Sequence, residues 1–165
     1  MRLRQTLRHL LAVEWLLRRR FNDAVLRAIE ERIGAIEARH AGEIRFVVEA
    51  ALDWRALWAG ISPRERALQV FGLLGVWDTA DNNGILIYVL LAEHAVEIVA
   101  DRGIAAKVIP AEWAAVSRTV EDHYRAGRFL EGSLAAIDGV GTLLQQHFPH
   151  RGADRNELPD QPVLI

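Results

Sequence analysis

The sequence contains no cysteine and no long apolar run. Without cysteine the chain has no disulfide bridges, thiolate zinc sites, thiol nucleophiles or thiol redox chemistry. Its longest uncharged apolar stretch covers only residues 84–92, about half of the ~18–20 residues that a membrane-spanning helix needs. We therefore expect no transmembrane segment.

Neither sign of charge predominates in the chain. Twenty Lys and Arg residues face 22 Asp and Glu residues, which gives a formal net charge of -2. A chain with this balance lacks the positive field of a typical nucleic-acid-binding protein, so we expect no nucleic acid partner. The length of 165 residues and the apolar content of 51% predict one globular domain with a single core.

The first 20 residues differ from the rest because they carry six arginines and only one acidic residue. Leucines and Trp15 at helical spacing predict a basic amphipathic helix. Its charges interrupt the apolar run, so we expect no signal peptide and a cytoplasmic location, peripheral at the inner membrane face. Such a helix binds anionic lipid or a membrane protein partner; the alternative is that its leucines belong to the core of the domain. The residues expected to contact a membrane or partner are Arg4, Arg8, Trp15, Arg18 and Arg19.

Hydrophobic periodicity and capping signals divide the remaining chain into helices and strands. Helices are predicted from residue 22 to about 36, from 62 to about 75, from 110 to 127 and from there to 149, with strands at 43–49, 85–91 and 96–100. A helix between the first two strands makes them parallel, and the short connection that follows makes the third antiparallel. The predicted fold is an α/β protein: a compact three-layer α/β/α sandwich with a small mixed sheet and helices on both faces.

Three regions follow from this prediction. They are a basic amphipathic helix at 1–20, the α/β/α domain at 21–150, and an extended or mobile tail at 151–165. The apolar end of the tail leaves two outcomes open, disorder or addition to an edge of the sheet.

Two smaller patterns bear on packing. Glycines 132, 139 and 141 lie inside the last predicted helix, where they are expected to allow close packing against the sheet. Trp54 and Trp58 lie four residues apart after the first strand. We expect them to pack under the helices, with an apolar patch for a partner as the alternative.

The predicted topology brings polar side chains to one edge of the sheet, where the second strand begins and the third ends. Asp78, Asp81, Asn82 and Asp101 offer oxygen ligands of the kind that Ca²⁺ or Mg²⁺ prefers, and we take them as candidate metal ligands. The alternative is that they serve the backbone of two turns.

Other charged groups have weaker candidate roles. Arg102 and Arg125 are candidates for binding an anion, Arg102 beside the third strand and Arg125 near the helix break at Gly127. The opposite edge of the sheet, with Glu49, Asp53, Glu93 and His94, is also a candidate because ligands of open α/β sheets bind beyond the carboxyl ends of the strands. It ranks second because it has no glycine-rich loop to hold a phosphate.

Three segments in this order resemble the TPM domain family, and the resemblance extends over about residues 22–148. They are residues 82–89, 96–104 and 124–132. The resemblance implies an α/β/α sandwich, and its members are described as acid phosphatases, divalent-metal binders and accessory factors for membrane protein complexes. After the third strand the family has a glycine-rich run with an acid, whereas residues 101–106 keep one glycine and lack that acid.

Two functions are therefore expected. The first is a non-catalytic binding or accessory domain that binds a divalent metal and acts with membrane proteins or at the membrane surface. The alternative is a divalent-metal-dependent acid phosphatase, in which Asp81 and Asp101 hold the metal and Arg102 holds the phosphate. A purely structural metal site is a third interpretation.

Overall fold

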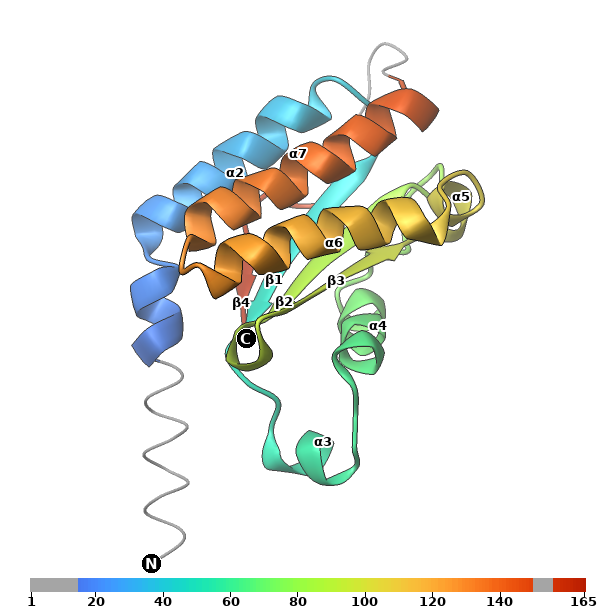
Figure 1. The fold of residues 1–165 in the computed structure, drawn as a ribbon. Helices are drawn as coiled ribbons and strands as arrows, with labels where there is room; N and C mark the ends of the chain where they lie inside the picture. The colour runs from blue at the N-terminus through green and yellow to red at the C-terminus, as the bar shows by residue number, and fades with distance from the viewer. Residues whose placement is uncertain (1–14, 150–155) are drawn as a thin grey trace, which may run out of the picture.

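The structure, a computed structural model, describes residues 15–149 and 156–165 and is built around a four-stranded sheet with the order β3-β2-β1-β4 (Figure 1). The strands are β1 (Glu43–Glu49), β2 (Gly84–Leu90), β3 (Ala95–Ala100) and β4 (Val163–Leu164). β1 runs parallel to both β2 and β4, whereas β3 is antiparallel to β2. The predicted mixed sheet is confirmed.

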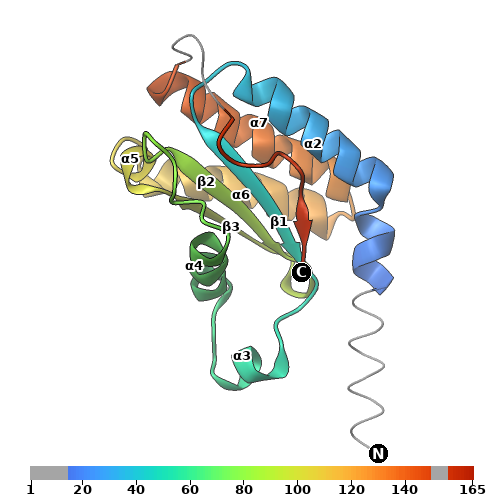
Figure 2. The ribbon, with the colours of Figure 1, turned by 180° about the vertical axis from the view of Figure 1, so that it is seen from behind.

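Helices cover both faces of this sheet. Helices α2 (Asp23–Glu37), α6 (Pro110–Arg125) and α7 (Phe129–His147) lie on one face, and α4 (Pro63–Leu73) lies on the other (Figures 1 and 2). Three short helices occupy connections: α3 (Trp54–Trp58), η1 (Leu91–Glu93) and α5 (Arg102–Ala105). The predicted α/β/α sandwich is confirmed, although these short helices were not expected.

The long helices begin where the capping residues predicted. The Asn22 side chain accepts hydrogen bonds from the first turn of α2. At the start of α4, Ser62 Oγ accepts from the Glu65 N–H at 3.2 Å and the Glu65 carboxylate accepts from the Ser62 N–H at 2.8 Å. These reciprocal bonds satisfy N–H groups that a helix start leaves unpaired, and they fix the position of α4 in the chain.

The core is divided by the sheet. Every residue of β2 is buried, and its side chains alternate between the two faces. Ile85 and Ile87 pack among α2, α6 and α7, whereas Leu86 and Tyr88 pack with α4. A strand that is apolar on both sides therefore occupies an inner position in the sheet.

The glycines of α7 serve helix contacts, so the prediction that they pack against the sheet is wrong. A Cβ at Gly132 would lie 2.6 Å from Tyr124 Cε1, and one at Gly139 would lie 3.0 Å from Val116, both on α6. A Cβ at Gly141 would overlap Ile36 of α2. The missing side chains let α7 approach its two neighbouring helices closely.

The end of the chain lies against the free side of β1. The Ile165 N–H donates to Val48 O, and the Ala50 N–H donates to Ile165 O, both at 2.9 Å. The Arg45 guanidinium donates to the carbonyl oxygens of Pro159 and Gln161. Of the two outcomes left open by the sequence, the structure has addition to the sheet edge.

Candidate functional site

The candidate metal ligands lie where β2 begins and β3 ends, at what we call the turn end (residues 78–83 and 101–103). Here the Gly103 N–H donates to Asn82 O at 3.0 Å, and the Asp101 N–H donates to Gly84 O at 2.9 Å. A Cβ at Gly103 would lie 2.5 Å from Asn82 O and 2.8 Å from Asp81 O. The turn and the start of α5 are therefore in direct backbone contact.

Asp101 is the buried acid of the turn end. One of its oxygens accepts from the Arg102 N–H at 2.7 Å and caps α5. Its other oxygen, Oδ2, is buried without a hydrogen-bond partner. Because an unpaired buried carboxylate oxygen is costly, this atom is the point at the turn end where a cation would be most favourable.

Asn83 has a second unpaired buried oxygen, Oδ1, but it does not join Asp101. The Asn83 amide donates to Ala41 O, in the connection between α2 and β1. Side chains alternate along paired strands, so Asn83 lies on the side of α2 and Asp101 lies on the side of α4, where Val99 also packs. The two oxygens are directed to different faces of the sheet.

The remaining candidate ligands are more exposed. Asp78 and Asp81 are solvent-exposed and Asn82 is half-buried. The Asn82 Oδ1 atom accepts from Arg102 Nε at 2.9 Å, so these two candidates bind each other. Within residues 15–149 and 156–165, no group of three or more His, Asp or Glu side chains is arranged to hold a metal ion. A cation at the turn end would thus depend on Asp101 together with amide and carbonyl oxygens.

The two candidate anion-binding arginines are far apart. Arg102 begins α5, whereas Arg125 ends α6, a helix that at 1.5 Å per residue is about 24 Å long. Arg125 forms ion pairs with Glu121 at 2.9 Å and with Asp122 at 2.8 Å. The structure does not bring the two arginines into one anion site.

The opposite edge of the sheet contains a closed polar cluster that the sequence analysis missed. The Glu49 carboxylate accepts from Arg66 Nε at 2.9 Å and from the Tyr88 hydroxyl at 2.7 Å. Burial raises the pKa of Tyr88, which keeps this hydroxyl protonated as a donor. The cluster joins β1, β2 and α4, and the charge of Glu49 is compensated within the domain.

Two tryptophans beyond this cluster are exposed, so the prediction that they pack under the helices is wrong. Trp54 is 62% exposed and Trp58 is 88% exposed. They lie on α3, a five-residue helix without a buried residue that stands away from the sheet in both views (Figures 1 and 2). Spacing alone gave no sign of this exposure, because it depends on what covers α3.

Residues 15–20 are helical and lead into the domain. Leu17 is buried in the main core, whereas Trp15 is 59% exposed and Arg18 and Arg19 are exposed. The Arg19 guanidinium lies 5.1 Å from the centre of the Trp15 ring. Leu17 thus attaches this segment to the core while its cationic side faces solvent. Arg4 and Arg8 lie outside the described residues.

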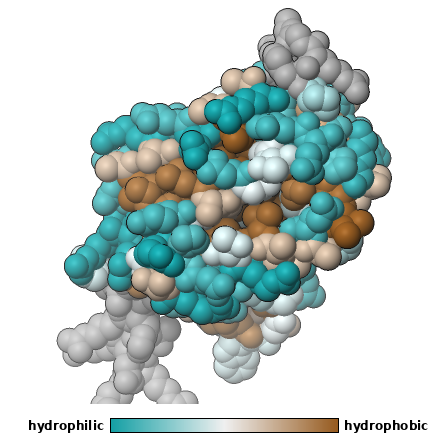
Figure 3. Space-filling view, turned by 45° about the horizontal axis from the view of Figure 1, so that its top comes forward, coloured by the Kyte–Doolittle hydropathy of each residue, from teal (hydrophilic) through white to brown (hydrophobic). Residues whose placement is uncertain are grey.

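No helix in the described part of the chain is both long enough and apolar enough to cross a membrane. The surface on the helical side of the sheet is mostly hydrophilic, with a hydrophobic band between hydrophilic regions (Figure 3).

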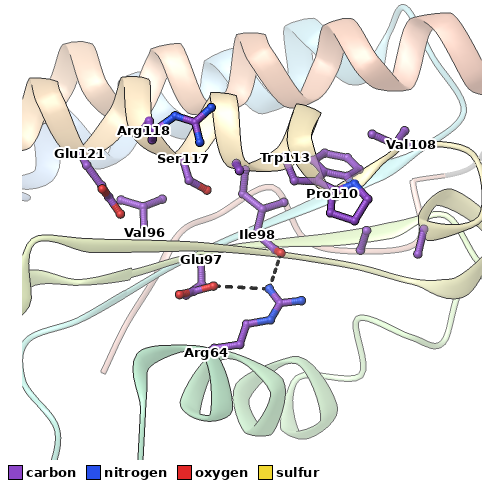
Figure 4. Close-up of a pocket in the computed structure, with 13 residues that line it drawn as sticks. Arg64, Val96, Glu97, Ile98, Val108, Pro110, Trp113, Ser117, Arg118 and Glu121 are labelled. Atoms are coloured by element: carbon purple, nitrogen blue, oxygen red, sulfur yellow. Dashed lines mark hydrogen bonds and ion pairs between the residues drawn. The ribbon is translucent and has the colours of Figure 1, made fainter.

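A groove of about 490 Å³ follows the free edge of β3 between α6 and the start of α4 (Figure 4). Arg64 lies at its rim and donates to Ile98 O at 2.6 Å. Ser117 is the one hydroxyl among its described lining residues, and no histidine lies among them. The described lining of the groove therefore has no serine–histidine pair of the kind that commonly activates a serine for hydrolysis.

Solved structures of similar fold come from bacteria. The NMR structure of the BA42 protein from Bizionia argentinensis has 28% sequence identity and a TM-score of 0.76, and the match covers 86% of this chain and 93% of that one. An N-terminal domain from P. gingivalis has 23% identity and a TM-score of 0.60, with 79% and 82% covered. An N-terminal domain from Corynebacterium glutamicum has 15% identity and a TM-score of 0.55, with 74% and 73% covered.

The sequence comparisons give a family and no curated relative. No curated protein matches the chain. The family model described as the TPM domain matches residues 19–143, which is most of the chain and includes all of α2 through α6. The chain therefore belongs to the TPM domain family.

Proposed function

We propose that the protein is a non-catalytic binding or accessory domain that acts at an anionic membrane surface, alone or beside membrane proteins. The observation that carries this proposal is the helical segment 15–20, in which buried Leu17 fixes an exposed Trp15 and exposed arginines to the domain. Each basic residue near an anionic bilayer contributes about 1 kcal/mol of attraction, and tryptophan favours the headgroup region.

Cosedimentation with vesicles of phosphatidylcholine and phosphatidylglycerol tests this proposal. The double variant Arg18→Glu/Arg19→Glu should weaken binding at least about tenfold, because it replaces attraction by repulsion. Arg39→Glu/Arg118→Glu changes the net charge equally at exposed positions on α6 and beyond α2, and it should bind almost as the unaltered chain does. Equal losses in both variants, or an unaltered chain that does not pellet, would contradict the proposal.

A second candidate is binding of Ca²⁺ or Mg²⁺ at the turn end. The buried, unpartnered Asp101 Oδ2 favours it, with Asp78, Asp81 and Asn82 as the further ligands that the sequence predicts. When bound, the cation would neutralise Asp101 and link the turn to α5. The phosphatase alternative has less support, because Arg102, the residue expected to hold the phosphate, already donates a hydrogen bond to Asn82 Oδ1 at 2.9 Å.

Calorimetric titration with Ca²⁺ and Mg²⁺ tests the second candidate. Saturable binding should raise the thermal midpoint, by the equivalent of about 2.7 kcal/mol at a hundredfold excess over Kd. Asp101→Asn should abolish binding, while Asp53→Asn should not, although Asp53 caps α3 in the same way. Unchanged binding in Asp101→Asn would exclude this site.

A further inference from the structure

We propose that α3 is a second lipid-contacting element, which places Trp54, Leu57 and Trp58 in the headgroup region of an anionic membrane. The inference deepens the proposed function and rests on it, because it adds a contact to the one assigned to residues 15–20. Together the two contacts would fix which end of the domain faces the membrane, and we call this the aromatic end (residues 15–20 and 53–58).

The large apolar side chains of α3 are directed to solvent, and only the small side chain of Ala56 packs against the core. Trp54, Leu57 and Trp58 are 62%, 57% and 88% exposed, although they are neighbours on one short helix. Single exposed apolar residues are common, but a contiguous group of large ones marks an interaction surface. Tryptophan is enriched where a bilayer meets water, because its ring is apolar and its N–H is polar.

The segment that carries these side chains has a defined conformation. The Asp53 carboxylate accepts from the Ala56 N–H at 2.8 Å and begins α3. The Ile61 N–H donates to Ala56 O at 3.0 Å, and Gly60 has a positive φ of 69° that ends the helix. Local hydrogen bonds therefore hold α3 in shape while its tryptophans remain in solvent.

Residues 15–20 and α3 both lie beyond the end of the sheet at which β1 finishes, and both views show this (Figures 1 and 2). A flat surface against this end would meet the Trp15 segment and α3 together. Two separate anchors are what stable peripheral binding requires, since one alone gives weak and reversible attachment.

The charges at the aromatic end favour anionic lipid as the occupant. Residues 18–20 are arginines, and Arg55 of α3 lies with its guanidinium 5.3 Å from the centre of the Trp54 ring. Within residues 15–20 and 53–58 the one acidic residue is Asp53, whose carboxylate caps α3. This excess of arginine matches a surface of phosphatidylglycerol headgroups.

The chain also supplies a control at the other end of α4. Leu73 and Trp77 are 77% and 54% exposed, and they adjoin Val76, whose carbonyl oxygen contacts Gly84 at the turn end. They are also large, exposed apolar side chains, one leucine and one tryptophan, but they belong to the end that would face away from the membrane.

The experiment compares the full chain with two double variants on vesicles of phosphatidylcholine and phosphatidylglycerol. Trp54→Ser/Trp58→Ser should weaken partitioning about tenfold or more, because two large apolar side chains no longer leave water. Leu73→Ser/Trp77→Ser should partition as the unaltered chain does. Because none of these four residues is buried, all variants should keep the thermal midpoint of the unaltered chain.

A second measurement reports on α3 directly. In Trp15→Phe, quenching of tryptophan fluorescence by brominated lipid should persist, and it should disappear when Trp54→Ser and Trp58→Ser are added. Partitioning and quenching that do not depend on Trp54 and Trp58 would overturn the inference. If Arg18→Glu/Arg19→Glu still abolished binding in that case, the proposed function would survive without α3. A full chain that binds no vesicles would overturn both.

Discussion

The turn end and the aromatic end of the sheet use their side chains in opposite ways. At the turn end, most polar groups serve the domain itself: one oxygen of Asp101 caps α5, and Asn82 accepts a hydrogen bond from Arg102. At the aromatic end, the large side chains of Trp54 and Trp58 are exposed to solvent. The comparison teaches that residues typical of binding chemistry can have structural roles, whereas residues typical of a core can lie on the surface.

The largest expected effect concerns the backbone packing of the turn end. Gly84→Ala would place a Cβ on the carbonyl oxygen of Val76, and backbone cannot move as a flexible side chain can. We expect a loss of about 3 kcal/mol or more in the free energy of unfolding, measured by urea denaturation.

Gly72→Ala is the control for this substitution. A Cβ at Gly72 would meet nothing within 4 Å, and the residue lies inside α4. Alanine should stabilise the helix by about 0.5–1 kcal/mol. A mild effect of Gly84→Ala would show that the turn end is looser than its contacts indicate.

A smaller effect is expected at the polar cluster of Glu49, Arg66 and Tyr88, which lies at the same end of the sheet as α3. Arg66→Ala would leave the carboxylate of Glu49, whose side chain is 8% exposed, without its cation. We expect a loss of about 2 kcal/mol, because Arg66 itself is partly exposed. Tyr88→Phe removes one hydrogen bond and should cost about 1 kcal/mol. If Arg66→Ala lowers the free energy of unfolding no more than Tyr88→Phe does, water compensates the Glu49 carboxylate as well as Arg66 does.

At the turn end, Asp101→Ala should destabilise the domain by about 1 kcal/mol through loss of the α5 cap. Asp101→Asn keeps a capping oxygen and should cost less. Thermal unfolding in the presence of chelator measures this structural role alone. If Asp101→Asn raises the thermal midpoint, the negative charge of Asp101 destabilises the protein when no cation is bound. That result is expected of a cation ligand.

The last effect is a pH dependence near the turn end. Burial, together with the nearby carboxylates of Glu43 and Asp160, raises the pKa of Glu37 to about 9, although the Ile44 N–H bond opposes the shift. The folded state keeps this proton where the unfolded state releases it, so the contribution of Glu37 to stability is fully present below pH ~4.5 and is lost as the pH rises toward 9.

Urea denaturation between pH 6 and 8 measures this dependence. We expect Glu37 to lower the free energy of unfolding with a slope close to the limit of about 1.4 kcal/mol per pH unit, because the folded state holds the proton over this range and the unfolded state does not. Glu37→Gln keeps an oxygen for the Ile44 N–H and an N–H for Asp160, and it should flatten the profile. An identical slope in Glu37→Gln would assign the dependence to other groups.

Local signals in the sequence predicted most of the fold. Ser62 and Glu65 gave the start of α4, and the apolar residues 85–90 gave the inner strand, because capping and periodicity are read over a few residues. β4 was only one of two outcomes that the sequence left open, and α5 was not predicted. β4 has only two residues and exists because β1 has an open side, and α5 has only four. Such short elements depend on tertiary contacts.

The candidate site was predicted less well than the fold. Topology correctly placed Asp101 near the turn at Asn82, but it could not show that α5 begins at Arg102 and uses the Asp101 carboxylate as its cap. The exposure of Trp58 could not be predicted from the sequence either. Spacing shows which residues share a face of a helix, but not whether another element covers that face. That Arg66 is the partner of Glu49 could not be predicted, because it depends on how α4 is positioned along the sheet.

The Arg64 hydrogen bond to Ile98 has a consequence for colloidal behaviour. β3 is the free edge of the sheet, and a free edge strand is a template on which another chain can add. The guanidinium occupies an outward carbonyl of that strand and places a charge beside it. We therefore expect Arg64 to oppose strand-to-strand association of neighbouring molecules, so that concentrated solutions of the domain should aggregate less readily through this edge of the sheet.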